Sequence, residues 1–319
     1  MHKRRWNALK LELVIEPRAP LLIKSGTASP NPSLPDMQFV RTMTPRGETV
    51  FIPGSSLKGV FRSFTEKVLR TLDVSGKPGP ADGKRWKWAC ATFEAKGNER
   101  RDPSKWNCPQ FLESIKPKDR DLETWEVYRN CCGACKIYGN TRLRGRLSFT
   151  DAFPESEVKT ETRYGVAISR LTNAVAVGPF DIEVLVQGKF KTSLVLENFE
   201  IWQLGLVALT LQALNDGLVK VGFGKNRGFG EVSVNVAEAI VEMARQAGLS
   251  QDTIWGVGAF VSEEEGRAYG LSPDDKLEGL PEGAESERGI FVRRSYGSEA
   301  WNNIADKAIA SLQKLSEAA

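Results

Sequence analysis

The sequence has almost no histidine. Its single histidine, His2, lies beside the first residue of a chain of 319 residues. Histidine is the usual general base near neutral pH and a common metal ligand. Its scarcity argues against histidine acid–base catalysis and against metal centres held by histidine.

A long hydrophobic run is also missing. The most apolar helical stretch, LGLVALTLQAL from Leu204, is too short to cross a bilayer. The basic N-terminus, MHKRRWNALK, is followed by no apolar segment and no cleavage site, so no signal peptide is predicted. We therefore expect a soluble cytoplasmic protein with no membrane partner.

Neither sign of charge is in large excess. The formal net charge is +4 and the isoelectric point is near 8.7, while 41% of the residues are hydrophobic and 26% are charged. These values are ordinary for a soluble globular protein. They are compatible with a polyanionic partner such as nucleic acid, but they do not identify one.

The cysteines are few, odd in number and close together in the sequence. They are Cys90, Cys108, Cys131, Cys132 and Cys135. An odd number argues against a complete disulfide framework. Cys132 and Cys135 form a C-x-x-C motif, whose spacing lets two thiolates hold one tetrahedral ion. We expect Cys90 and Cys108 to complete a structural zinc site, with Cys131 as the spare; free thiols or a redox pair are the alternatives.

The apolar pattern indicates an α+β fold. Residues 9–15 alternate apolar and polar side chains, as expected of a half-buried strand. Strands before and after each expected helix suggest two split βαβ units in an α+β sandwich. The expected helices are 55–72 and 200–215, and the further expected strands lie in 146–154, 181–197 and 230–240.

Two regions fall outside this core pattern. Residues 73–135 are rich in charge, glycine, proline and tryptophan, and we predict a cysteine-bearing insertion there. The core then comprises residues 1–72 and 136–240, and residues 241–319 form a C-terminal extension. Within the extension we expect a helix after Glu238, an exposed acidic loop, a strand at IFVRR and an amphipathic final helix. This last helix either packs on the chain or docks another subunit.

The stretch FIPGSSLKGVFRSF, residues 51–64, begins a predicted helix with two hydroxyl groups. A Pro-Gly turn comes first, and Ser55 or Ser56 can cap the helix by accepting from its first free amides. Those amides and the positive end of the helix dipole also suit a phosphate, with Lys58 and Arg62 close by. An ordinary capped helix is the alternative.

The stretch VGFGKNRGFGEV, residues 221–232, places two cations at the tip of a glycine-rich turn. Glycines let the backbone approach a ligand closely, and Lys225 and Arg227 can neutralise phosphates. Phe223 and Phe229 either stack on bases or anchor the loop in the core. The G-x-x-x-x-G-K-S/T order of a P-loop is absent, and a tight glycine hairpin without a ligand is the alternative.

Together the two motifs resemble the RAMP superfamily of CRISPR-associated proteins. More narrowly, the chain resembles the repeated backbone subunit of type III effector complexes. The resemblance extends through CGACKIYGNTRLRGRLSFTDAFPE, residues 132–155, and TRYGVAISRLTNAVAVGPFDIEVLVQGKFK, residues 162–191. It covers most of residues 10–236 apart from the cysteine-bearing insertion.

The resemblance implies an RRM-like, ferredoxin-like core that assembles along a guide crRNA with neighbouring RAMP subunits and other effector subunits. Residues 160–180 would form a β-hairpin thumb that separates the guide from the single-stranded target RNA at intervals. RNA would be read by its shape and by guide pairing rather than by a base-specific code. The implied RNA-contacting residues are Arg41, Ser55, Ser56, Lys58, Arg62, Arg163, Arg170, Gly224, Lys225, Arg227, Gly228 and Phe229.

The resemblance also implies a catalytic aspartate. Members that cut target RNA carry one just before the block that contains IPGSS, and Asp36 occupies that place here. With Mg²⁺ or Mn²⁺, its carboxylate would help the ribose 2′-oxygen attack the adjacent phosphate, giving a cyclic phosphate and a 5′-hydroxyl. Since some relatives are inactive, a non-catalytic guide-binding subunit is the main alternative, followed by a guide-processing RNase. Asp151, in FTDAF, is instead expected to be a turn or cap residue.

Overall fold

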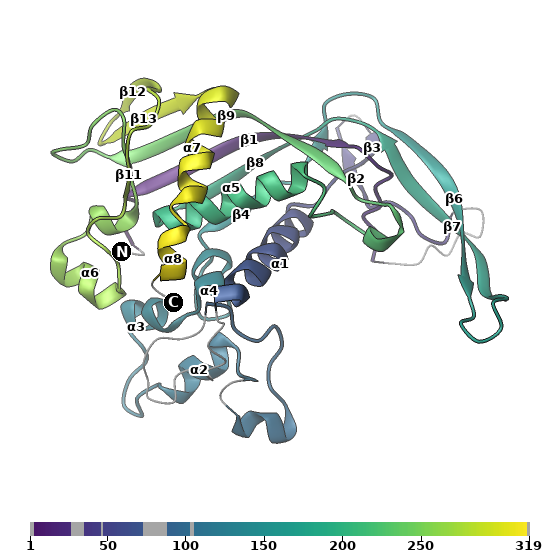
Figure 1. Cartoon of the computed structure of the whole chain (residues 1–319), viewed down its shortest axis with the longest axis horizontal. Helices are drawn as coiled ribbons and strands as arrows, with labels where there is room; N and C mark the ends of the chain where they lie inside the picture. Colours follow the sequence, from purple (N-terminus) through teal and green to yellow (C-terminus); the bar gives the residue numbers. More distant parts are fainter. Residues whose placement is uncertain (1–2, 27–34, 46, 73–87, 103–104, 318–319) are drawn as a thin grey trace.

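The structure is a computed structural model that describes residues 3–26, 35–45, 47–72, 88–102 and 105–317. His2 and residues 73–87 of the predicted insertion lie outside the described residues. The largest element is a seven-stranded antiparallel sheet (Figure 1). Its strands are β1 (Asn7–Pro17), β4 (Leu147–Phe149), β5 (Phe153–Pro154), β8 (Phe190–Glu197), β9 (Val232–Ala244), β12 (Ala284–Arg288) and β13 (Phe291–Tyr296).

Helices cover one face of this sheet (Figure 1). α5 (Ile201–Asn215) lies against β9, α7 (Ser298–Ala310) packs on both, and α1 (Gly54–Leu72) contacts β4 and α5. The crossing of α5 and α7 is close, since a Cβ atom on Gly205 would lie 2.4 Å from the carbonyl oxygen of Ala308. The result is the two-layer α+β sandwich expected from the sequence. Among the described residues, no helix is both long and apolar enough to cross a bilayer.

The centre of the sheet is built from two split βαβ units. One is β1–α1–β4 and the other is β8–α5–β9, and together they give the strand order β9-β1-β8-β4. β1 lies in the middle, with Leu9 opposite Leu196 of β8 and Val241 of β9. Leu9, Leu11 and Leu13 of this strand are at most 1% exposed, as its alternating pattern predicts. The arrangement is consistent with the predicted RRM-like, ferredoxin-like core.

A long hairpin of β6 (Lys159–Ile168) and β7 (Val175–Gln187) projects away from the sheet (Figure 1). Its base is held by isolated bridges from Leu21 to Leu185 and from Met37 to Ile182. Its outer part is open to solvent, and it spans the segment where a thumb is predicted. Two further small sheets are formed by β2 (Arg41–Thr44) with β3 (Gly47–Val50) and by β10 (Ile254–Trp255) with β11 (Lys276–Leu277).

The described part of the cysteine-bearing segment is more deeply buried than its composition predicts. Cys108, Leu112 and Tyr128 have no exposed surface, and the Tyr128 hydroxyl donates a hydrogen bond to the buried carboxylate of Glu200. Although the segment is polar overall, these few side chains are part of the buried core of the protein. Its helices are α2 (Cys108–Ser114), α3 (Thr124–Asn130) and α4 (Gly133–Tyr138), with a 3₁₀ turn at Gly97–Arg101.

The residues after Glu238 continue the sheet and the helical layer. The helix expected there is wrong, because β9 runs on to Ala244. Residues 239–244 are all buried, so they lack the alternation that identifies a half-buried strand. The acidic segment that follows is mostly exposed, as expected, but it is not only loop, since it contains α6 (Glu263–Tyr269), β11 and β12. The strand at IFVRR and the final helix are confirmed as β13 and α7, and α8 (Gln313–Glu317) follows.

Candidate RNA-binding surface and metal centre

α1 begins tightly against the connection between β4 and β5. The backbone N–H of Gly54 donates to Oδ1 of Asp151 at 2.8 Å, so the carboxylate of a distant residue caps the helix. This confirms the cap role expected of Asp151, whereas the expected serine cap is wrong. A Cβ atom on Gly54 would lie 2.8 Å from the carbonyl oxygen of Phe149, which only glycine avoids. Ser55 and Ser56 therefore lie in the first turn, with Ser55 exposed.

The two cations of α1 have different surroundings. Lys58 is partly exposed, and burial together with the charge of Arg62 lowers its pKa. Arg62 points into the protein, where it donates to the carbonyl oxygen of Gly139 at 3.2 Å and to Glu66 at 2.8 Å. Its guanidinium is thus committed to internal partners. Of the two, Lys58 is the residue placed to meet a phosphate.

The glycine-rich loop has the shape that its sequence suggests. Gly222, Gly224, Gly228 and Gly230 all have positive φ, and a Cβ atom on Gly230 would lie 2.1 Å from the carbonyl oxygen of Val221. The backbone therefore requires glycine at these turns. Between them Lys225–Arg227 forms an exposed 3₁₀ turn.

The two phenylalanines of this loop differ in exposure. Phe229 is only 8% exposed and anchors the loop, so its ring is not available to stack on a base. Phe223 is partly exposed, and the guanidinium carbon of Arg227 lies 5.9 Å from its ring centroid. In this loop, Phe223 and Arg227 are therefore the residues available to stack on a base.

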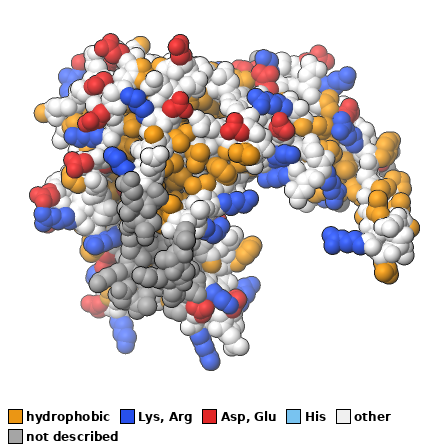
Figure 2. All heavy atoms as spheres, in the orientation of Figure 1, with side chains coloured by type: hydrophobic (Ala, Val, Ile, Leu, Met, Phe, Trp, Pro, Cys, Tyr) orange, Lys and Arg blue, Asp and Glu red, His pale blue; other side chains and the backbone are white. Residues whose placement is uncertain are grey.

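The tip of the loop and α1 share one surface. Burial lowers the pKa of Lys225, and the nearby charge of Lys67 on α1 lowers it further. Lys67 and Lys225 therefore place two positive charges near each other on this surface. Figure 2 shows Lys and Arg side chains along the edge of the hollow between the body and the projecting hairpin. The sequence singled out Lys225 but not Lys67, because an exposed lysine on a helix gives no signal.

Asp36 is fixed beside the base of the projecting hairpin. Its Oδ2 accepts a hydrogen bond from the backbone N–H of Asp181 at 3.0 Å, and its side chain is exposed. The nearby Arg41 forms an ion pair with Glu183, a buried carboxylate that also accepts from the backbone N–H of Phe39 at 3.0 Å. Arg41 is therefore paired within the protein rather than free. Asp181 is a second acid at this place that sequence reasoning missed.

The two arginines of the hairpin are both on its exposed part. Arg163 forms an ion pair with its strand neighbour Glu161 at 2.6 Å, and Arg170 lies exposed in the turn between β6 and β7. An exposed ion pair of this kind is weak and easily exchanged for a phosphate. Both residues lie on the element predicted to contact RNA.

The structure brings together the four cysteines singled out as metal ligands. Cys90, Cys108, Cys132 and Cys135 are buried, and their sulfur atoms all lie within 4.8 Å of one another. Cys131 lies outside this group and accepts a hydrogen bond from the Asn140 side chain at 3.3 Å. All five cysteines are free of disulfide bonds. Among the described residues, this is the group of three or more cysteine, histidine or acidic side chains placed to hold an ion.

The four sulfur atoms lie close enough together to bind one metal ion such as zinc. A Zn–S bond of about 2.3 Å places two ligand sulfurs of a tetrahedron roughly 3.8 Å apart. The sulfur atoms of Cys90 and Cys135 are 3.8 Å apart. Backbone N–H groups of Cys132 and Cys135 donate to the sulfurs of Cys108 and Cys132 at 3.2 Å and 3.4 Å. Such donors stabilise thiolates, the form that binds metal.

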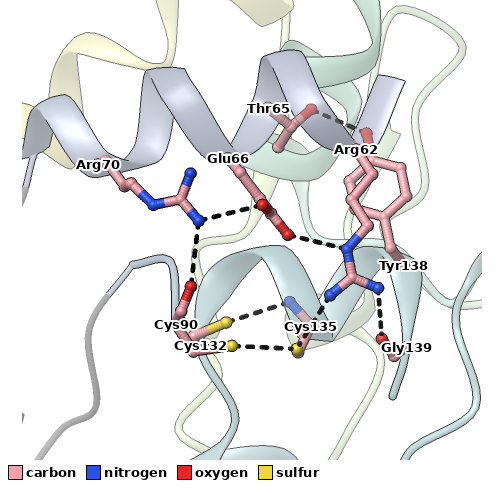
Figure 3. Close-up of polar contacts among 9 residues, drawn as sticks. All are labelled: Arg62, Thr65, Glu66, Arg70, Cys90, Cys132, Cys135, Tyr138 and Gly139. Atoms are coloured by element: carbon pink, nitrogen blue, oxygen red, sulfur yellow. Dashed lines mark hydrogen bonds and ion pairs between the residues drawn. The ribbon is translucent and has the colours of Figure 1, made fainter. Parts of the chain in front are cut away.

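Charges on α1 face this cluster (Figure 3). Arg62 reaches the sulfur of Cys135 at 3.8 Å, and Glu66 lies between Arg62 and Arg70. Glu66 is buried, and both arginines donate to its carboxylate. A hydrogen bond from the thiol of Cys108 lowers the pKa of Cys135, whereas burial raises the pKa of the Cys132 thiol.

The sequence was also compared with models of known protein families. A model of the RAMP superfamily matches residues 14–233. The chain belongs to the RAMP superfamily. RAMP proteins are CRISPR-associated RNA-binding subunits, so the matched region of this RAMP protein, from β1 to β9, is that of an RNA-binding protein. No curated protein matches the chain.

Proposed function

We propose that this RAMP protein is the guide-RNA-binding backbone subunit of a type III CRISPR complex and that it cleaves the bound target RNA. The observation that carries the proposal is the convergence of two distant motifs: the tip of the glycine-rich loop lies near α1, because the charge of Lys67 on α1 lowers the pKa of Lys225. Both elements border the hollow beside the projecting hairpin (Figure 2). A single RNA strand fits this combination of cations and backbone amides.

The proposed guide path follows the exposed side of α1 to the loop. Ser55, Ser56 and Lys58 would contact phosphates at the helix start through their side chains, because Asp151 accepts from the Gly54 amide and the carbonyl oxygen of Pro53 accepts from the amides of Ser56 and Leu57. Lys67, Lys225, Arg227 and the amides of Gly224 and Gly228 would continue the path. Arg62 belongs to the metal centre instead, and Phe229 supports the loop from inside. Arg163 and Arg170, on the hairpin proposed as the thumb, would contact phosphates of the guide or of the target RNA.

The proposed cleavage site is Asp36 at the base of the hairpin. The hydrogen bond from Asp181 orients its carboxylate, which would accept or direct the proton of a target 2′-hydroxyl. Mg²⁺ is commonly held by one or two carboxylates with water and substrate phosphates, and Asp36 and Asp181 fit that donor set. Such an ion would supply charge stabilisation for the developing phosphorane.

A non-catalytic subunit is the second candidate, and one observation favours it. Among the described residues, no third acid, histidine or cysteine joins Asp36 to form a group that could hold an ion. The protein would then bind guide and target as a filament module without cutting. Both candidates share the RNA path and differ only in the chemistry at Asp36.

The test is cleavage of a matched target RNA by the assembled ribonucleoprotein. Asp36→Ala should abolish product at the positions covered by this subunit while guide content stays at the wild-type level. Glu264→Ala, which removes an exposed acid of α6, is the control and should cleave like wild type. Unchanged product with Asp36→Ala would reject catalysis by this residue, and absence of any co-purified guide RNA would reject the backbone role.

A further inference from the structure

One face of α1 is directed at the cysteine cluster rather than at solvent or RNA. Arg62, Glu66 and Arg70 are spaced four residues apart, which places them in one row on the helix. Glu66 accepts from Arg62 at 2.8 Å and from Arg70 at 3.1 Å (Figure 3). The carboxylate thus holds both guanidinium groups above the four sulfur atoms.

Each arginine contacts a different part of the ligand set. Arg62 donates to the sulfur of Cys135 at 3.8 Å and to the carbonyl oxygen of Gly139, which ends α4, at 3.2 Å. Arg70 donates to the carbonyl oxygen of Cys90 at 3.1 Å. The C-x-x-C turn and the separate segment that carries Cys90 are therefore both fixed from α1.

With a metal ion bound, the contacts of Arg62 and Arg70 would offset the negative charge of the four thiolates. Four thiolates around a divalent cation leave two net negative charges in a buried place, and an uncompensated buried charge is costly. Donors to ligand sulfur lower this cost and hold the ligand in position.

We propose that Arg62, aligned by Glu66 and assisted by Arg70, is a positioning residue of the metal centre: its N–H group stabilises the Cys135 thiolate and couples α1 to the bound ion. This inference rests on the proposed zinc site. It reassigns Arg62 from RNA contact to metal retention. It also makes α1 the element through which the metal supports the RNA surface.

The experiment uses the full chain loaded with Zn²⁺, and with Co²⁺ as a spectroscopic probe. Arg62→Gln should weaken metal affinity in chelator competition by about 10- to 100-fold, the range typical of lost partners around a metal site. It should also shift the thiolate-to-Co²⁺ absorption band. Guide RNA affinity of the metal-loaded variant should stay within about threefold, because the residue does not touch RNA.

Two further variants make the result specific. Arg120→Gln removes an arginine that pairs with Glu126 in the same segment, away from the sulfurs, and should bind metal like wild type. Arg62→Lys keeps the charge but not the planar fork, so we expect an intermediate metal affinity and a shifted Co²⁺ band. If Arg62→Gln does not fold, the metal affinity and Co²⁺ band of Arg62→Lys test the positioning role instead.

The outcomes distinguish the positioning role of Arg62 from the existence of the metal centre. Wild-type affinity and an unshifted Co²⁺ band in Arg62→Gln, or in Arg62→Lys if that variant decides, would overturn the positioning role and leave the metal centre standing. A wild-type chain that binds neither ion with a four-thiolate spectrum would overturn the metal centre and this inference together.

Discussion

The cysteine-bearing segment and the β6–β7 hairpin are two additions to the same sheet with opposite burial. In the segment, Leu112 and Tyr128 have no exposed surface. In the hairpin, Tyr164 is 75% exposed, Ile168 62% and Leu171 93%. The segment is thus held by contacts within this chain, whereas these apolar side chains of the hairpin are exposed to solvent.

The comparison shows that the polar or apolar composition of a segment does not by itself predict whether the segment is buried. The segment is rich in charge, yet Cys135 contacts Arg62 of α1, and Trp88 and Tyr128 contact Trp202 and Gln203 of α5. The hairpin is richer in β-branched and aromatic residues, yet only its base touches the body. A metal ion held by the four cysteines would compensate for the small apolar core of the segment.

The largest expected effect comes from removing a ligand. Cys135→Ser should abolish tight metal binding and lower the free energy of unfolding by about 3–5 kcal/mol, because the segment loses the ion that organises it. Cys131→Ser is the matched control and should keep one bound ion per chain. Metal content by mass spectrometry and denaturant unfolding measure the two effects; equal metal loss in both variants would contradict the ligand assignment.

A smaller effect is expected from a matched pair of tyrosines. Tyr128→Phe removes the donor to the buried Glu200 carboxylate and should cost about 1–3 kcal/mol of unfolding free energy. Tyr164→Phe, on the exposed hairpin, should change it by less than about 0.5 kcal/mol. Denaturant unfolding of both variants checks this. A Tyr164→Phe loss as large as that of Tyr128→Phe would break the distinction between an anchored segment and a free hairpin.

Much of the fold could be predicted because its signals are local and periodic. The alternation of β1 and the apolar stripe of α1 each describe one buried face, and C-x-x-C spacing identified the cysteine cluster. Buried runs such as residues 239–244 carry no such period, so the end of β9 was mistaken for a helix.

The missed parts of the site depend on contacts between distant residues. The sequence predicted that Asp151 is a turn or cap residue but not which helix it caps, because that helix begins 97 residues earlier in the chain. Arg62 and Glu66 have the spacing of an ordinary exposed ion pair, and only the position of Cys135 shows that they face inward. Local sequence determines which residues are charged, and the tertiary fold determines what each charge meets.

The central claim is that α1 and the glycine-rich loop form one RNA-binding surface, and the salt dependence of guide RNA affinity tests it most directly. The variant Lys67→Ala/Lys225→Ala/Arg227→Ala should bind more weakly and lose about 2 from the slope of log affinity against log salt, since each phosphate contact on a single strand contributes about 0.7. Lys105→Ala/Lys116→Ala/Arg120→Ala, in the cysteine-bearing segment, should keep the wild-type slope. Equal slopes and affinities for the first variant and wild type would contradict the account.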